Sequence, residues 1–264
     1  MTQGRRSVRE LKGFVFDLDG CVWNGAEVTP GAPELIAELR RASRSVAFLT
    51  NNSRATARDI LDRLEALGIE ADRERVLTPL EILGEFIRER RGPSRVLVIG
   101  AEEMAKVIGR AGHEVLSVER YREATVVAVG NDFDLSYARL TAAARAVAAG
   151  AWLVTPNVDP RLPMEGGEFL PGCGAIVEAV AIAGGHRPAI VGKPEPPLFR
   201  IALTRLGLAP AQSVMVGDSL EADVRGARRV GMRTVLYAPD GGPASDEPDL
   251  TVRSFVELRR ALLP

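Results

Sequence analysis

Two aspartates separated by one residue follow an apolar stretch near the amino end of the chain. The stretch 14–16 has the composition of a buried strand, and Asp17, Asp19 and Gly20 follow it. Residues two apart in a strand lie on the same face, so the two carboxylates would be neighbours. They would repel each other unless a cation lies beside them or one of them keeps a proton. The pattern indicates a polar site, although an Asp pair before glycine is also typical of a turn.

Three later apolar runs also end in polar residues. In an α/β fold with a parallel sheet, the carboxyl ends of the strands lie along one edge, so the residues that follow different strands meet there. We therefore expect these polar residues to lie near the Asp pair. The run 46–49 is followed by Thr50 and Asn51, the run 189–191 by Gly192 and Lys193, and the run 214–216 by Gly217, Asp218 and, five residues on, Asp223.

These four stretches, in this order, resemble the four motifs of the haloacid-dehalogenase-type phosphatase superfamily. The quoted residues are DLDGCVWNG, LTNNS, GKPEPP and GDSLEADVRGARRVGM. The first motif, the TNN triplet and the long interval before GKP are similar to the branch that contains NagD-like, p-nitrophenyl-phosphate and phosphoglycolate phosphatases. The resemblance covers nearly the whole chain, and four ordered motifs are far more specific than any one of them.

The resemblance assigns roles to the two aspartates. Hydrolysis of a phosphate ester by a covalent route needs a nucleophile, a proton source for the leaving oxygen and positive charge on the transferring phosphoryl group. Asp17 is the implied nucleophile, which forms an aspartyl phosphate, and Asp19 is the implied general acid and then general base. Two neighbouring carboxyl groups can fill these two roles only if their environments differ. We therefore expect a cation to keep Asp17 ionised. We expect burial and a like charge to raise the pKa of Asp19.

The resemblance implies that the residues after the runs 46–49 and 189–191 bind phosphate. Lys193 would neutralise the phosphoryl charge, the Thr50 hydroxyl would donate to a phosphate oxygen, and Asn51 would add an amide or main-chain N–H. Each has a plainer interpretation, since TNNS is also an ordinary turn and helix-capping string and a lysine before proline also occurs on surface loops.

A metal site is expected beside the nucleophile. Gly217 lets the chain turn and present the carboxylate of Asp218 at a strand end. Together with Asp17 and, in the family pattern, the main-chain carbonyl of Asp19, it offers hard oxygen ligands, for which Mg²⁺ is the expected ion. Asp223 would act on the metal through water; its plainer interpretation is a solvated helix acid. The chain has only two histidines. This small number disfavours phosphate transfer through a histidine and a zinc site with histidine ligands.

The order of predicted elements indicates an α/β fold in two parts. We expect residues 1–78 and 186–264 to form a discontinuous Rossmann-like core with a parallel sheet, and residues 79–185 to form a large inserted α/β cap. Ser53 would cap the second helix, and the chain would return to the core through the strand at 188–191. The expected strands are 45–49, 95–99, 125–129, 152–155, 188–191, 213–217 and 233–237, and the expected helices are 30–42, 54–67, 80–90, 101–111, 136–149, 174–183, 195–207, 220–230 and 254–262.

The cap is expected to select the substrate. Asn157, Asp159 and Arg161 are candidate polar contacts, and Gly172 and Gly174 would permit close approach of a substrate. The segment around these glycines lacks the third glycine and the preceding strand of a dinucleotide-binding loop. The residues themselves do not identify which phosphorylated metabolite is bound.

The composition of the chain bears on its binding partners and on its cellular compartment. A formal net charge of −1 and a pI near 6.2 give no basic field for nucleic acid or an anionic membrane. Cys21 and Cys173 are too few for a disulfide framework, and no apolar run approaches the length of a spanning helix. We expect a cytoplasmic protein that acts on a small phosphorylated metabolite. A homodimer is compatible with the resemblance, but composition gives no evidence for it.

Two alternatives to hydrolysis stay open. A phosphomutase or phosphotransferase would pass the aspartyl phosphate to another hydroxyl, and sequence does not exclude it. A non-catalytic phospho-receiver or binding module also combines carboxylates, a threonine and a lysine at strand ends. Such a module needs neither Asp19 beside the nucleophile nor more than a hundred residues between LTNNS and GKP, which disfavours it here.

Overall fold

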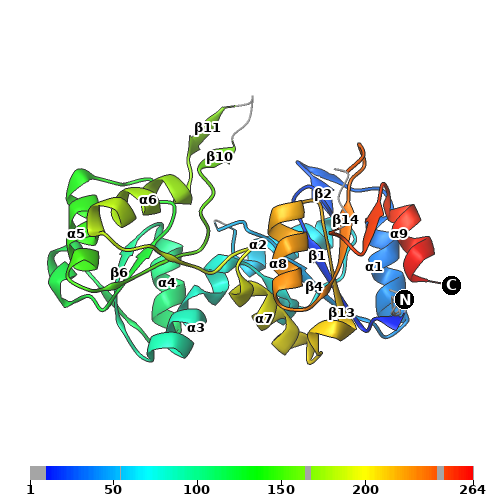
Figure 1. Cartoon of the computed structure of the whole chain (residues 1–264), viewed down its shortest axis with the longest axis horizontal. Coiled ribbons are helices and arrows are strands. Elements are labelled where there is room, and N and C mark those ends of the chain that lie inside the picture. The colour runs from blue at the N-terminus through cyan, green and yellow to red at the C-terminus, as the bar shows by residue number, and fades with distance from the viewer. Residues whose placement is uncertain (1–9, 54, 164–167, 243–246, 264) are drawn as a thin grey trace. The chain divides into compact units, whose positions relative to one another are not determined.

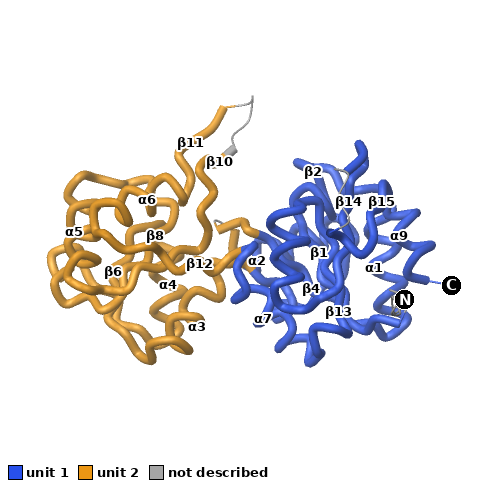
Figure 2. The backbone as a smooth tube through the Cα atoms, in the orientation of Figure 1, with its two compact units in different colours: residues 1–50, 57–77, 193–264 blue, residues 51–56, 78–192 orange. Residues whose placement is uncertain are grey.

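The computed structural model describes residues 10–53, 55–163, 168–242 and 247–263. The chain folds into two compact units (Figure 2). The first unit comprises residues 1–50, 57–77 and 193–264, and the second comprises residues 51–56 and 78–192. Each unit is built around a parallel sheet of its own.

The sheet of the first unit has six strands in the order β15-β14-β13-β1-β4-β5, and all neighbours are parallel. The central strand β1 is buried along its whole length, as expected for a strand covered on both faces. The strands are β1 (Gly13–Asp17), β4 (Ser45–Leu49), β5 (Val76–Leu77), β13 (Ser213–Gly217), β14 (Arg233–Tyr237) and β15 (Leu250–Val252).

Helices cover this sheet, and aromatic side chains fill part of the space between them. The ring of Phe16 lies 6.4 Å from that of Phe48 and 6.3 Å from that of Phe255, centroid to centroid. A short hairpin of β2 (Trp23–Asn24) and β3 (Glu27–Val28) follows β1. The helices are α1 (Ala32–Arg41), α2 (Ala57–Ala66), α7 (Pro196–Leu206), α8 (Gly226–Arg229) and α9 (Phe255–Leu262), with 3₁₀ turns at Arg73–Arg75 and Pro210–Gln212 and a π-helical turn, η6, at Leu220–Arg225.

The second unit has a five-stranded parallel sheet in the order β12-β9-β8-β6-β7. A two-stranded antiparallel ribbon, β10 and β11, extends from it (Figure 1). The strands are β6 (Arg95–Ile99), β7 (Glu114–Leu116), β8 (Val126–Val129), β9 (Trp152–Thr155), β10 (Arg161–Pro163), β11 (Phe169–Pro171) and β12 (Ala189–Ile190); the helices are α3 (Pro79–Arg91), α4 (Glu102–Arg110), the 3₁₀ helix η3 (Val118–Glu123), α5 (Tyr137–Ala148) and α6 (Cys173–Gly184).

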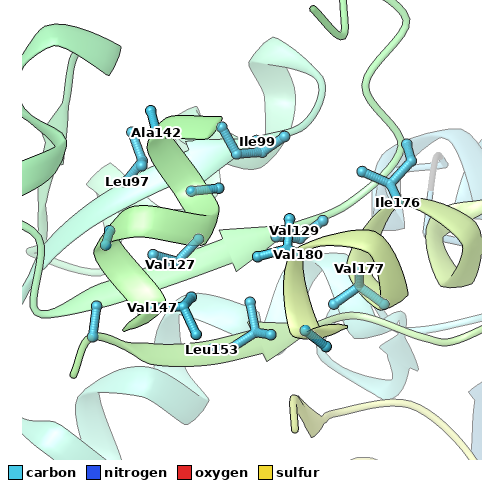
Figure 3. Close-up of a cluster of buried hydrophobic side chains, with 14 residues drawn as sticks. Leu97, Ile99, Val127, Val129, Ala142, Val147, Leu153, Ile176, Val177 and Val180 are labelled. Carbon is cyan, nitrogen blue, oxygen red and sulfur yellow. The ribbon is translucent and has the colours of Figure 1, made fainter. Parts of the chain in front are cut away.

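A compact apolar core holds α5 and α6 against one face of the second sheet (Figure 3). Alternate residues of the strands point into it, as the two-residue period of a strand requires. Val127 and Leu153 meet Val147 of α5 and Val180 of α6 there, and all four are buried. Burial of apolar surface contributes about 25 cal/mol per Å², so this layer stabilises the second unit.

The fold class predicted from the sequence is confirmed, because the chain forms α/β units with parallel sheets and a second α/β unit lies between the second and third motifs. The expected strands at 45–49, 95–99, 152–155, 213–217 and 233–237 have those bounds. The helix expected at 220–230 is instead a π-helical turn followed by the short α8. The short strands β2, β3, β5, β7, β10, β11 and β15 were not anticipated, because two or three residues carry no periodic signal.

The two compact units divide the chain differently from the expected bounds at two places. The strand expected to return to the core at 188–191 is β12, which pairs with β9 of the second unit, and the main-chain N–H groups of Val191 and Gly192 donate to Thr155 and Pro156. The first unit therefore resumes at Lys193 rather than at residue 186. Residues 51–56 were expected in the core and belong to the second unit. The helix that Ser53 was expected to cap begins only at Ala57, and the Ser53 hydroxyl accepts hydrogen bonds from Asn131 and Asn157.

None of the helices in the described part of the chain has the length and apolar character that crossing a membrane requires.

Two positions on α6 test the core of the second unit. Val180 is fully buried, whereas Ile182 is 79% exposed on the same helix. Val180→Ala removes two buried methyl groups and should lower the free energy of unfolding by about 1–3 kcal/mol. Ile182→Ala should change it by about 0.5 kcal/mol or less. Urea unfolding followed by circular dichroism measures both, and equal losses would contradict the assigned core.

Candidate active site

The centre of the site is a lysine held between two buried carboxylates. Lys193 Nζ lies 2.5 Å from Asp17 Oδ1 and 2.6 Å from Asp223 Oδ1, and the three side chains are at most 7% exposed. Asp17 ends β1, Lys193 precedes α7, and Asp223 lies in η6. Segments separated by more than 170 residues of sequence thus meet at the carboxyl end of β1, as a parallel sheet predicts.

The backbone around Asp223 is shaped to hold its carboxylate in place. The main-chain N–H of Ser219 donates to Asp223 Oδ2 at 3.0 Å, while the Ser219 hydroxyl accepts from the N–H of Ala222 and caps the π-helical turn. A Cβ at Gly217 would lie only 2.2 Å from Asp223 Oδ2. Glycine is therefore required at the end of β13 for the carboxylate to reach Lys193.

The electrostatics of the cluster follow from burial. Removal from water raises the pKa of Asp17 well above its ordinary value; the ammonium of Lys193 opposes this shift, and the negative charge of Asp223 adds to it. The pKa of Lys193 is raised, because the two carboxylates stabilise its charged form more than burial disfavours it. The lysine is thus a fixed positive charge.

Three carboxylates in this unit are close enough to hold a cation. Asp17, Asp218 and Asp223 each offer an oxygen, and these atoms lie within 4.8 Å of one another. Partial desolvation and the charge of Asp223 raise the pKa of Asp218. Gly20 has a φ of +88°, and a Cβ there would lie 2.3 Å from Asp218 Oδ2, so the chain leaves space for that carboxylate. This set of hard oxygen donors fits a divalent cation such as Mg²⁺. We expected Asp223 farther out, whereas its carboxylate is part of the cluster.

Asp19 has an environment different from the one expected. Its side chain is exposed, whereas we expected it to be buried. The reason is that the chain turns after Leu18 and carries Asp19 out of the sheet. Its carboxylate instead accepts two hydrogen bonds, from Trp23 Nε1 at 2.8 Å and from the Thr50 hydroxyl at 3.1 Å. Asp17 and Asp19 thus differ strongly in exposure, although in the sense opposite to our prediction.

Thr50 and Asn51 fall on different sides of a unit boundary. Thr50 is buried in the first unit, and its hydroxyl donates to Asp19. Asn51 begins the segment 51–56 of the second unit, where its carbonyl accepts from the Asn157 amide at 2.8 Å. The structure therefore places Thr50 beside the aspartates of the first unit and assigns Asn51 to the other unit.

The other residues predicted for the cap have contacts within the second unit. The Asn157 amide also donates to the hydroxyl of Ser53, so this side chain fastens the segment 51–56. Asp159 is exposed, and its carbonyl accepts from the N–H of Gly174. The guanidinium of Arg161 lies 4.3 Å above the ring of Phe169.

The two cap glycines let the chain approach itself closely. A Cβ at Gly172 would lie 2.3 Å from the carbonyl oxygen of Asp159, and one at Gly174 would lie 2.2 Å from that of Val158. The start of α6 thus packs directly against the segment before β10. We had expected the missing side chains to make room for a substrate.

Trp23 is a residue of the site that the sequence reasoning missed, because it was not connected with Asp19. Trp23 is buried. Its indole N–H, which can only donate, lies against the carboxylate four residues earlier. The available signal was this spacing, a donor shortly after the acid in a turn rich in glycine.

Comparisons with known proteins agree with this geometry. Residues 14–114 match a family model described as haloacid dehalogenase-like hydrolase, and residues 190–258 match a second described as HAD-hydrolase-like. Chronophin from Mus musculus is 35% identical over 236 residues, which cover 86% of this chain and 80% of that protein. This chain belongs to the haloacid dehalogenase-like hydrolases.

Other members of the family that resemble the chain are named phosphatases. The acid sugar phosphatase of Staphylococcus haemolyticus is 32% identical over 228 residues, covering 86% of this chain and 85% of that protein. The solved p-nitrophenyl phosphatase from Archaeoglobus fulgidus superposes with a TM-score of 0.85 at 28% identity, covering 96% of this chain and all of that one. The similarity spans both units, so this haloacid dehalogenase-like hydrolase is a phosphatase of the branch recognised from its motifs.

Replacing the central lysine tests the charge balance. Lys193→Met leaves Asp17 and Asp223 buried together without a counter-charge, and should cost about 3–5 kcal/mol of unfolding free energy at neutral pH. The loss should shrink as the pH falls, because without the ammonium the folded protein binds a proton at Asp17 more tightly than the unfolded chain does. Lys106→Met, on the exposed face of α4, is the control and should cost about 0.5 kcal/mol or less. Denaturant melts at several pH values measure both; a pH-independent loss would contradict this account.

The two cysteines should be unreactive in the folded protein. Burial raises the pKa of Cys173 to about 11 and raises that of Cys21 well above its ordinary value, and the charge of Asp17 adds to the second shift. Because the thiolate is the reactive form, a thiol reagent such as DTNB should label neither residue at pH 8 and should label two per chain after unfolding. Rapid labelling of one thiol in the native protein would contradict the assigned burial.

Proposed function

We propose that this phosphatase hydrolyses a phosphomonoester of a small metabolite through an aspartyl phosphate on Asp17, with Asp19 as general acid and base and with Mg²⁺ as cofactor. The observation that supports it most strongly is the pair of contacts that Lys193 makes with Asp17 and Asp223 at the end of β1. A buried carboxylate beside a fixed positive charge and a neighbouring proton carrier is the arrangement that covalent phosphoryl transfer needs.

The first step transfers the phosphoryl group to the protein. A carboxylate oxygen of Asp17 bonds to phosphorus, the bond from phosphorus to the ester oxygen breaks, and the leaving oxygen takes a proton from Asp19. Lys193 and the Thr50 hydroxyl offset the negative charge of the transferring group. In the second step Asp19 takes a proton from water, whose oxygen attacks phosphorus, and inorganic phosphate leaves with Asp17 restored.

The metal would be held by Asp17, Asp218 and the main-chain carbonyl of Asp19, with Asp223 beside them. When bound, it would supply positive charge to the phosphoryl oxygens. The protein's own part is to keep the three carboxylates in place, which the glycines at 20 and 217 and the Ser219 N–H achieve.

The substrate class rests on the kind of site and on the relatives. A site of a few polar groups on rigid elements suits a small phosphorylated molecule, and one relative is named an acid sugar phosphatase. Sugar phosphates are therefore the first group to test in a screen of phosphorylated metabolites for released phosphate. Asn157, Asp159 and Arg161 remain candidate selectors in the second unit, with Asn157 also fastening the segment 51–56.

Turnover of p-nitrophenyl phosphate tests the mechanism. Asp17→Asn removes the nucleophile and should lower kcat by on the order of 10³-fold or more. EDTA should abolish activity, and added Mg²⁺ should restore it. Asp62→Asn, an exposed acid on α2, is the control and should leave turnover unchanged. Undiminished activity of the Asp17→Asn protein would refute the covalent route. Release of less phosphate than p-nitrophenol in the presence of an added alcohol would instead identify a phosphotransferase.

A further inference from the structure

The indole of Trp23 is fixed against one oxygen of Asp19. Its Nε1 lies 2.8 Å from Asp19 Oδ1, whereas the Thr50 hydroxyl lies 3.1 Å from the other oxygen, Oδ2. The two donors thus divide the carboxylate between them. Trp23 is only 2% exposed, so its N–H does not exchange freely between Asp19 and water.

The main chain ties Trp23 to Asp19 through a tight turn. The N–H of Trp23 donates to the carbonyl of Leu18, and the N–H of Gly20 donates to the carbonyl of Trp23. Asp19 and Trp23 also form an isolated bridge outside the regular strands. These bonds fix the backbone of Trp23 relative to that of Asp19, so the two side chains start from a constrained separation.

Arg63 of α2 fixes the outer face of the indole. Its guanidinium carbon lies 4.1 Å from the centroid of the Trp23 ring, and its Nη2 donates to the carbonyl of Gly25. A cation over an aromatic face is attracted to the ring, and the bond to Gly25 holds the β2–β3 turn in the same place. The indole therefore has a neighbour that opposes rotation away from Asp19.

The two donors on Asp19 differ in how easily they can be redirected. The Thr50 hydroxyl can rotate, and a phosphate oxygen in the proposed site would compete for its proton. The indole N–H cannot rotate without moving the whole buried ring. A bound phosphate would therefore free Oδ2 while Oδ1 stays fastened.

We propose that Trp23 is a positioning residue: by holding Oδ1 of Asp19, it leaves Oδ2 as the atom that exchanges a proton with the leaving oxygen and then with water. This inference rests on the proposed function of Asp19 as general acid and base. It explains how an exposed acid keeps one orientation during the reaction, since burial does not constrain it.

The dependence of rate on the leaving group separates positioning from folding. A poor leaving group, such as unsubstituted phenolate, needs the proton of Asp19 more than p-nitrophenolate does. Trp23→Phe keeps an aromatic ring and removes the N–H. It should lower kcat/KM for phenyl phosphate about 10-fold or more and that for p-nitrophenyl phosphate about 3-fold or less, because general acids contribute roughly 10²–10⁴-fold. If Trp23 had only a structural role, the substitution would lower kcat/KM for both substrates by the same factor. Equal losses would therefore overturn the inference.

Two further variants make the outcome specific. Trp152→Phe is the same substitution at the other tryptophan, in β9 of the second unit, and should leave both rates unchanged. Asp19→Asn should show the same selective loss as Trp23→Phe, and a larger one. If Asp19→Asn slows both substrates equally, the proposed role of Asp19 fails; if it is selective and Trp23→Phe is not, only the positioning role fails.

A fluorescence measurement keeps the inference testable if Trp23→Phe does not fold. In the Trp152→Phe protein, Trp23 is the sole indole. Asp19→Leu in that background removes the acceptor, and the emission of Trp23 should move to shorter wavelength because the N–H loses a charged partner. Unchanged emission would overturn the hydrogen bond on which the inference stands.

Discussion

The site depends on one buried ammonium between two carboxylates. The carboxylates of Asp17 and Asp223 would not both stay ionised at a buried site without a counter-charge. The ammonium of Lys193 lies between them and supplies that charge. Such a cluster gains little stability for the fold as a whole, because desolvation opposes the attraction between the charges. Its value lies in arrangement, since it keeps the Asp17 carboxylate oriented at the edge of the sheet.

The sequence was sufficient to predict the parallel sheets and the meeting of distant motifs. Strands such as 45–49 and 213–217 are apolar runs that end sharply at Thr50 and Asp218, and the topology of a parallel sheet does the rest. The first unit accordingly contains Asp17, Lys193 and Asp218. The carboxylates of Asp17, Asp218 and Asp223 form one cluster within it. Residue type and position along the strand carried this information.

What the sequence could not supply is the direction of individual side chains and short tertiary pairings. Asp19 was expected on the face of a strand, but the chain turns one residue earlier and exposes it. Asp223 enters the cluster because η6 is π-helical, which no period in the sequence indicates. The strand β12 has only two residues, so its pairing with β9 depends on residues far away in the sequence. The first two misses concern local backbone geometry without a sequence period, and the third concerns a pairing that distant residues decide.

The segment 51–56 belongs to the second unit although it lies apart from the rest of that unit in the sequence. The chain passes from one unit to the other after residues 50, 56, 77 and 192, although the second unit contributes its sheet in the single stretch 78–192 (Figure 2). The hexapeptide is held in the second unit by the amides of Asn131 and Asn157. Moving residues 78–192 of this chain into a related protein would leave Asn131 and Asn157 without the partners they have in residues 51–56, so a transplant of the second unit has to include both segments.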